Sequence, residues 1–236
     1  MPSIARKNSR PNVVHGLRDR KKARRREDIL TAASALFAAK GIDATTMAEI
    51  ADAVDVSPPT IFNYFGNKDG ILIALITEGA QKARLVHRDM LARTDADFGT
   101  VLVDLFTLFA GRTLEIASKR IWRYAEAAAI RHPGTELARR YATVDHELVG
   151  LVALFFDQYT LRLRSGVVPD PELLAQVFYD AWNTAFFELI KDDHKTVSQH
   201  RAELCARFVP LAQMIFTDEF LASPSLKSGI SHNGPS

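Results

Sequence analysis

The sequence predicts an all-α protein with an N-terminal three-helix unit, built around a helix-turn-helix, and a larger C-terminal helical domain. Apolar residues recur every three or four positions through most of the chain, which is the spacing of one helix face. No stretch combines β-branched residues with the apolar–polar alternation of a strand. Pro133 and Pro169 fall between the apolar stretches, where helices are expected to end.

Length and composition indicate an ordinary globular protein. The chain has 236 residues, of which 47% are hydrophobic and 25% charged, enough for one large core or two modest domains. Its one cysteine, Cys205, excludes an internal disulfide framework and favours a reducing compartment. The longest apolar run, residues 148–156, is too short to cross a bilayer, and no signal peptide is expected. We therefore expect a cytoplasmic protein with no membrane partner.

Positive charge is concentrated at the start of the chain. The formal charge of +2 divides into +9 for residues 1–26 and −7 for the remainder. Residues 1–23 are expected to form a basic, disordered arm. Such a block either attracts a polyanion such as DNA, along the backbone or in the minor groove, or is simply a solvated tail.

The first helix is expected over residues 24–40, where apolar residues form one stripe and Gly41 suits the C-terminal cap. A second, short helix is expected to begin at Thr46, whose hydroxyl can form a capping box with Glu49. Asp55 interrupts its apolar pattern and tolerates the left-handed backbone that a sharp turn needs.

The third helix completes a helix-turn-helix over residues 46–65. Ser57 is its expected N-cap, and Pro58 and Pro59 suit a first helical turn. Ile61 and Phe65 face inward at i and i+4, which leaves polar side chains facing out: Thr60, Asn63 and Tyr64. This is how a recognition helix is offered to the DNA major groove.

Side-chain type predicts several phosphate contacts. Hydroxyls and one ammonium group lie at or just beyond helix ends: Thr46, Thr60, Tyr64 and Lys68. Arg24 and Arg25 begin the first helix and are expected near the DNA backbone. Capping is the structural alternative for Thr46 and Ser57, and it is compatible with DNA contact.

Residues 24–84 resemble the DNA-binding domain of the TetR (tetracycline-repressor-like) family of transcriptional regulators. The resemblance is carried by Phe37, Gly41, Thr46, Ile50, Ala51, Val56, Ser57, Thr60, Tyr64, Phe65 and Lys68. It implies that Ser57, Pro58, Pro59 and Asn63 look toward base edges. Two residues depart from the family pattern: Asp55 replaces the usual turn glycine, and Phe62 replaces a phosphate-binding tyrosine.

The remainder is expected to be helical. A long helix over about 69–93 leads into an effector-binding and dimerisation domain of residues 85–220. Further helices are expected at about 97–117, 119–131, 135–165, 171–191 and 195–217. Residues 221–236 are expected to be a disordered tail.

The last two helices are apolar over more than one face, which indicates burial on two sides. We expect the second side to pack against a twin in a four-helix dimer interface, as the resemblance also implies. The residues predicted at this interface are Phe178, Trp182, Phe186, Leu204, Phe208, Leu211 and Ile215.

The middle helices carry many aromatic residues. The plain interpretation is hydrophobic core. The resemblance adds an alternative, a pocket for a small, largely apolar effector. The predicted pocket residues are Phe106, Phe109, Trp122, Arg123, Glu126, His146, Phe155, Tyr159 and Asn183.

No catalytic site is predicted. Asp145, His146 and Glu147 are consecutive, so on a helix they diverge and make poor joint metal ligands. We expect no metal and no cofactor. The sequence thus predicts a homodimeric repressor released from a palindromic DNA operator by a small effector. The alternatives are a DNA-binding regulator controlled by a protein partner and, less favoured, an α-helical enzyme or carrier.

Overall fold

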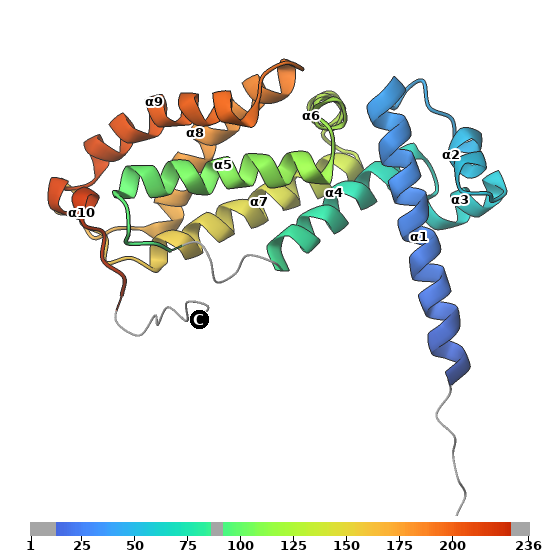
Figure 1. Ribbon diagram of the computed structural model, residues 1–236, viewed down its shortest axis with the longest axis horizontal. Helices are drawn as coiled ribbons and strands as arrows, with labels where there is room; N and C mark the ends of the chain where they lie inside the picture. The colour runs from blue at the N-terminus through green and yellow to red at the C-terminus, as the bar shows by residue number, and fades with distance from the viewer. Residues whose placement is uncertain (1–12, 86–91, 228–236) are drawn as a thin grey trace, which may run out of the picture.

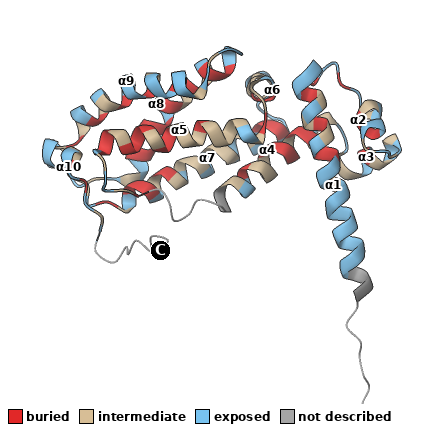
Figure 2. Ribbon diagram, viewed as in Figure 1, coloured by how far each residue is buried: buried red, intermediate tan, exposed pale blue. Residues whose placement is uncertain are grey.

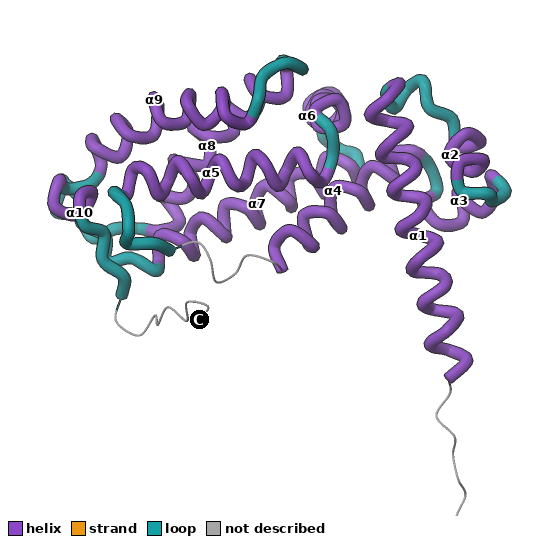
Figure 3. Tube along the Cα trace, in the orientation of Figure 1, coloured by secondary structure: helices purple, strands orange, loops and turns teal. Residues whose placement is uncertain are grey.

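The computed structural model describes residues 13–85 and 92–227, and every regular element in these ranges is a helix. The predicted all-α fold is confirmed (Figure 1, Figure 3). One end of the molecule holds α1 (Val13–Lys40), α2 (Met47–Ala53) and α3 (Pro58–Phe65), and α4 (Lys68–Leu85) runs from it into the helical body. That body holds α5 (Phe98–Ile116), α6 (Lys119–Arg131), α7 (Glu136–Asp157), α8 (Pro171–Lys191), α9 (Val197–Ile215) and α10 (Asp218–Ala222).

The basic segment before Arg24 is helical where the structure describes it. Helix α1 starts at Val13, so the expectation of disorder is wrong for residues 13–23. The physical reason is composition, because six of the seven residues from Leu17 to Ala23 are good helix formers. This part of α1 extends beyond the neighbouring helices (Figure 1), and its residues 16–23 are exposed (Figure 2). Residues 1–12 lie outside the described residues.

The helix-turn-helix has the predicted local geometry. Thr46 caps α2 in a reciprocal capping box with Glu49. Asp55 is the one non-glycine residue with positive φ in the described chain, at φ 53°, and it forms the turn. The three-helix unit closes over fully buried side chains: Ile29, Ala33, Phe37, Ile50, Ala51 and Ile61. Their burial fixes which face of α3 remains outside.

Helix α4 crosses α5 closely at Gly79. A Cβ on Gly79 would lie 2.4 Å from Cγ2 of Ile116, nearer than two carbon atoms can pack. Its neighbours Ile71, Leu72 and Ile76 are buried. Helix α4 therefore packs into the core of the three-helix unit and into the core of the helical body. Helix α4 was expected to reach residue 93, but it is described only to Leu85, residues 86–91 are outside the described residues, and Ala92 and Arg93 are not helical.

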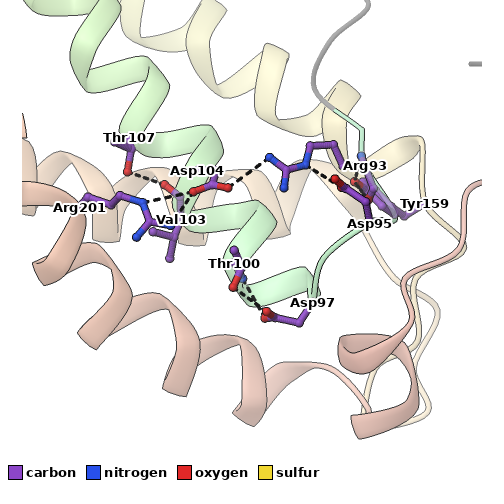
Figure 4. Close-up of polar contacts among 9 residues, drawn as sticks. All are labelled: Arg93, Asp95, Asp97, Thr100, Val103, Asp104, Thr107, Tyr159 and Arg201. Carbon is purple, nitrogen blue, oxygen red and sulfur yellow. Dashed lines mark hydrogen bonds and ion pairs between the residues drawn. The ribbon is translucent and has the colours of Figure 1, made fainter. Parts of the chain in front are cut away.

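The segment after α4 is fixed to α5 and α9 through Asp104 (Figure 4). Arg93 donates to Asp104 at 3.2 Å, and Arg201 of α9 donates to the other carboxylate oxygen at 2.8 Å. The Tyr159 hydroxyl donates to the carbonyl of Arg93 at 2.9 Å and accepts from its amide at 2.8 Å. These contacts join four separate segments of the chain: the one after α4, α5, α9 and the one after α7.

Two predicted boundaries near the C-terminus are corrected. Helix α7 ends at Asp157 and not at 165, because the following residues run extended beside the chain end. Tyr159 bridges Leu226, and Leu163 bridges Phe216. Residues 221–227 were expected to be disordered, yet they include the end of α10 and this pairing. Hydrophobic side chains such as Phe220 anchor them, since its ring lies 4.8 Å from that of Phe98. Residues 228–236 lie outside the described residues.

No helix in the described ranges is both long enough and apolar enough to cross a membrane.

The backbone at Asp55 generates the first prediction. Glycine adopts φ 53° without steric cost, whereas a β-branched residue does not. We expect Asp55→Gly to leave the free energy of unfolding within about 1 kcal/mol of the original chain, and Asp55→Val to lower it by about 1–2 kcal/mol. Urea unfolding followed by circular dichroism measures both. Equal stability of the two variants would contradict a conformational role for this residue.

Candidate DNA-binding surface and effector cavity

The N-terminal end of α3 presents a mixed polar and apolar surface. Ser57, Pro59 and Asn63 are exposed, and Pro58 is half-buried. Ser57 occupies the N-cap position but makes no side-chain cap bond. Its hydroxyl lies 3.0 Å from that of Thr60 instead. The predicted base-reading side chains therefore lie together at one accessible helix end.

Phe62 lies on the same helix and is 50% exposed. About half of the side chain is therefore covered by the domain and half is open to a ligand. An exposed phenyl ring offers apolar contact, for example to a thymine methyl group.

Two of the predicted phosphate contacts are already engaged within the protein. Lys68 donates to the carbonyls of Ile42, at 2.7 Å, and Asp43, at 3.1 Å, which ties α4 to the loop before α2. The Tyr64 hydroxyl lies 3.5 Å from the carbonyl of Lys22 and so approaches α1. Lys68 has three donors, so one remains for phosphate.

Thr46 is also part of a local network. Its hydroxyl accepts from the amide of Glu49 at 3.2 Å. The side chain of Lys40 and the Thr46 hydrogen bonds lower the pKa of Glu49 to about 2. The carboxylate is therefore ionised, and Lys40 compensates its charge at the start of α2.

The exposed part of α1 supplies the positive charge that the helix-turn-helix itself lacks. Arg24 and Arg25 are exposed, and the residues before them on the same helix are also exposed and basic: Arg18, Arg20, Lys21 and Lys22. Arg26 differs, because its guanidinium lies 4.5 Å from the centre of the Phe65 ring and pairs with Glu78 of α4. Sequence reasoning did not separate Arg26 from its neighbours.

A cavity of about 130 Å³ lies among α4, α5, α6, α7 and α8. Four predicted pocket residues line it: Phe109, Trp122, Phe155 and Asn183. Among the lining residues that sequence reasoning missed are five with acidic or aromatic side chains: Tyr141, Asp145, Tyr179, Trp182 and Phe186. Tyr141 and Asp145 are spaced i, i+4 on one helix, and this spacing could have identified them as neighbours.

Five predicted pocket residues do not line the cavity. Phe106 is fully buried in the core, with its ring centre 5.0 Å from that of Phe208. Tyr159 packs among the aromatic rings near Arg93. His146 is exposed on the outer side of α7.

The other two are Arg123 and Glu126, both on α6. Arg123 donates to Asp193 at 2.9 Å and also binds the carbonyl of Ile190, so it closes the α8–α9 loop. Glu126 lies outside the lining, where it interacts with the Tyr141 hydroxyl. These polar residues were predicted as ligand contacts, but they are used to hold helices together.

Asp145 is the unusual ionisable group of the cavity. Burial raises its pKa to about 6, a hydrogen bond from Tyr179 opposes this rise, and the charge of Glu126 adds to it. Burial also raises the pKa of Tyr141 and Tyr179 above the ordinary value for tyrosine. Both hydroxyls therefore remain neutral donors at the carboxylate side of the cavity.

The predicted dimer residues require a correction. Five of them are buried within the chain itself: Phe178, Trp182, Phe186, Leu204 and Phe208. Leu211 and Ile215 are partly buried and pack on the same core. The faces that remain open carry other residues: Leu173, Val177 and Thr184 on α8, and Ala202, Ala206, Pro210 and Met214 on α9. Because both helices are apolar over so much of their circumference, sequence alone does not say which stripe faces inward.

An exposed recognition helix, a basic flanking helix and a helical body with an internal cavity define the class of helix-turn-helix regulators. A family model described as bacterial regulatory proteins of the tetR family matches residues 29–75. The repressor Rv1474c of Mycobacterium tuberculosis is 31% identical over 179 residues, which cover 66% of this chain and 89% of that protein. The chain therefore belongs to the TetR family of transcriptional regulators, and the resemblance stated from the sequence is confirmed.

Other relatives agree with this assignment. The transcriptional repressor BdcR of Escherichia coli is 33% identical over 86 residues, which cover 36% of this chain and only 43% of that protein. A crystal structure of a TetR-family transcriptional regulator from Pectobacterium atrosepticum superposes with a TM-score of 0.59 at 16% identity, covering 82% of this chain and 94% of that one. These relatives are regulators, so the alternative of an α-helical enzyme is set aside.

The raised pKa of Asp145 generates a stability prediction. Because the folded-state pKa of about 6 exceeds the ordinary 3.8, ionisation costs stability as pH rises between these values, and the cost is complete above pH 6. We expect Asp145→Asn to raise the free energy of unfolding by about 1–2 kcal/mol at pH 7.5, and to give no gain at pH 3.5. Urea unfolding at the two pH values measures this.

A matched control is Asp157→Asn, the same change at the exposed end of the same helix, where Asp157 pairs with Lys227. It should change stability by less than about 0.5 kcal/mol at either pH. A pH-independent effect of Asp145→Asn would refute the assigned burial of its charge.

Proposed function

We propose that this regulator is a homodimeric repressor that binds a palindromic operator and is released from it by a small effector. The observation that supports this best is the combination of an accessible α3 N-terminus with the exposed basic helix beside it. In this proposal, residues 24–84 form the DNA-binding domain and residues 85–220 the effector-binding and dimerisation domain. The family assignment supports the general role of a transcriptional regulator.

The contacts we propose follow the exposure of each side chain. Ser57, Pro59 and Asn63 meet base edges in the major groove, where Asn63 can bond an adenine through two atoms. Pro58 and Phe62 add apolar contact. Backbone phosphates are met by Thr46, Thr60, Tyr64, the remaining donor of Lys68, Arg24 and Arg25.

The basic part of α1 acts as a rigid extension along the phosphate backbone. Its side chains are held on a helix, and a helix of this width does not enter the narrow minor groove of ordinary duplex DNA. The earlier expectation of a minor-groove arm therefore applies only to residues 1–12. Backbone contact supplies affinity without sequence preference.

The outer faces of α8 and α9 form the proposed dimer interface. Leu173 and Met214 are 62% and 76% exposed, so they gain most from burial against a second chain. Small residues such as Ala202 and Ala206 allow close helix approach. A two-fold dimer built there presents two recognition helices, which requires an inverted repeat in the DNA.

Helix α6 provides a direct mechanical connection between the cavity and the DNA-binding unit. Arg120 donates to the carbonyls of Ala38, at 3.3 Å, and Ala39, at 2.9 Å, at the C-terminal end of α1. Two residues further on, Trp122 lines the cavity and donates to the carbonyl of Thr113 at 2.8 Å. A ligand that displaces Trp122 therefore moves the residue that holds α1. A coupling of about 1–3 kcal/mol between the two sites is sufficient for release.

Selection of random duplex DNA by the purified full chain tests the function. We expect enrichment of an inverted repeat at physiological salt, because two α3 helices read two half-sites. Asn63→Ala should keep the fold and reduce the base preference at one position of each half-site in the selected DNA, since it removes an adenine contact. Val177→Glu, on the outer face of α8, should give monomers in sedimentation and lose the paired half-sites. Binding without any enriched sequence would overturn the proposal.

The basic extension generates a salt prediction. In a variant with Arg18, Lys21, Lys22 and Arg25 changed to Gln, the helix should persist because Gln is a good helix former. We expect the slope of log affinity against log salt to fall by about 2–4 units, at about 0.9 per lost phosphate contact. Titration of a labelled operator at several salt concentrations measures the slope.

The matched control changes Arg139 and Arg140 of α7 to Gln, because both are exposed and belong to the helical body, outside the three-helix unit. Its slope should equal that of the original chain. An unchanged slope in the four-residue variant would show that the extension does not contact DNA.

A further inference from the structure

The cavity has one strongly polar side. Asp145 of α7 lines it beside Tyr141 and Tyr179, while most of the remaining wall is hydrocarbon and aromatic. The described salt bridges include none to Asp145. A carboxylate that faces an apolar cavity without a cation attracts a positively charged ligand group.

The charges around Asp145 add to this attraction. From α6, Glu126 contributes a second negative charge, and from α8 Tyr179 contributes only a neutral hydroxyl. Tyr141 on the same helix is also neutral at physiological pH, and α4 contributes only alanines to the lining. The cation of the lining, Arg112 of α5, is paired with Glu115 at 2.7 Å. Negative charge is therefore concentrated locally at Asp145, with Glu126 behind it, on the α6–α7 side of the cavity.

Aromatic rings continue from the acidic side around the wall. The ring of Trp122 lies 6.1 Å from that of Tyr141 and 6.5 Å from that of Phe186. The Trp182 ring lies 5.0 Å from Phe186 and 5.6 Å from Tyr179. Ring faces carry partial negative charge, so Trp and Tyr walls favour ammonium groups. A neutral ligand would gain from the apolar contacts alone.

We propose that this cavity binds a small organic cation, with an ammonium group at Asp145 and roughly one ring among the aromatic side chains. The volume of about 130 Å³ sets the size, because a dry cavity of about 150 Å³ in another protein accepts benzene. The inference rests on the proposed function for its regulatory meaning, since it names the chemical class of the effector. The binding itself can be tested without DNA.

Three small molecules of similar shape and different charge distinguish the effect of ligand charge on binding from the effect of ligand size. Benzylammonium is a cation at neutral pH, ethylbenzene is its neutral isostere, and benzoate is an anion of similar size. Binding to the full chain is measured by tryptophan fluorescence, because Trp122 and Trp182 line the cavity. We expect the cation to bind at least about tenfold more tightly than the isostere, and the anion not to bind.

Variants then assign the charge preference to one residue. Asp145→Asn should weaken cation binding about 10- to 100-fold and leave the neutral isostere unchanged, because it removes only the charge. The control Asp157→Asn should leave both unchanged. Lowering the pH from 7.5 to 5 should weaken cation binding in the original chain and not in Asp145→Asn, since Asp145 has a pKa of about 6. Unfolding of Asp145→Asn by urea verifies that this variant is folded.

The results that would overturn the cation site differ from those that would overturn the proposed function. No cation binding, equal affinity for the neutral isostere, or an Asp145→Asn variant with undiminished cation affinity would each overturn the inference. Failure of the proposed function is seen separately, as absence of an inverted repeat in the DNA selection. Asp145-dependent binding that leaves operator affinity unchanged would support the cation site and refute its role as the release signal.

Discussion

The close crossing of α4 and α5 at Gly79 is the constraint on which the rest of the arrangement depends. Because no side chain fits between Gly79 and Ile116, the two helix axes approach closely and α4 is held in both the DNA-binding unit and the helical body. Ile116 and Ala80, the residue next to Gly79, also line the cavity. The cavity wall and the base of the helix-turn-helix are thus parts of one packed contact.

In the DNA-binding unit, several polar side chains are engaged in contacts within the protein itself. Lys68 binds two backbone carbonyls, Thr46 and Glu49 cap α2, and Arg26 holds α3 to α4. These bonds leave fewer free donors for phosphate than the sequence indicates, but they fix the angle of α3. Preorganisation of this kind lowers the entropy lost on binding. Exposed residues of α1 then supply the attraction that these engaged side chains do not.

Local signals in the sequence were sufficient for the helix-turn-helix. The capping box at Thr46, the left-handed turn at Asp55 and the prolines after Ser57 each depend on neighbours within a few residues, so their geometry could be predicted. The full extent of α1 could not, because a highly charged stretch fits both a solvated helix and a disordered arm. The family was recognised because many weak signals fall at fixed spacing.

Signals that depend on distant contacts failed more often. Phe178 and Phe208 are apolar whether they face the core or a partner chain, so residues predicted at a dimer interface lie instead in the core of the chain itself. The extended segment that follows α7 was not predicted, because it pairs with residues near 226, which are distant in the sequence. The sequence does not distinguish aromatic residues that pack in the core from those that line the cavity. Asp145 was considered only with its chain neighbours, and its partners Tyr179 and Glu126 lie on other helices.

In the proposed complex, the N-terminal extension of α1 also determines how much DNA each protomer covers. Residues 13–23, at 1.5 Å per residue, add about 16 Å of helix. Laid along a duplex, this length corresponds to about five base pairs at 3.4 Å each. On this proposal each protomer covers DNA beyond the bases that α3 reads. Neighbouring binding sites on a promoter would then need to be spaced to leave these flanking base pairs free, although the sequence of those base pairs would not matter.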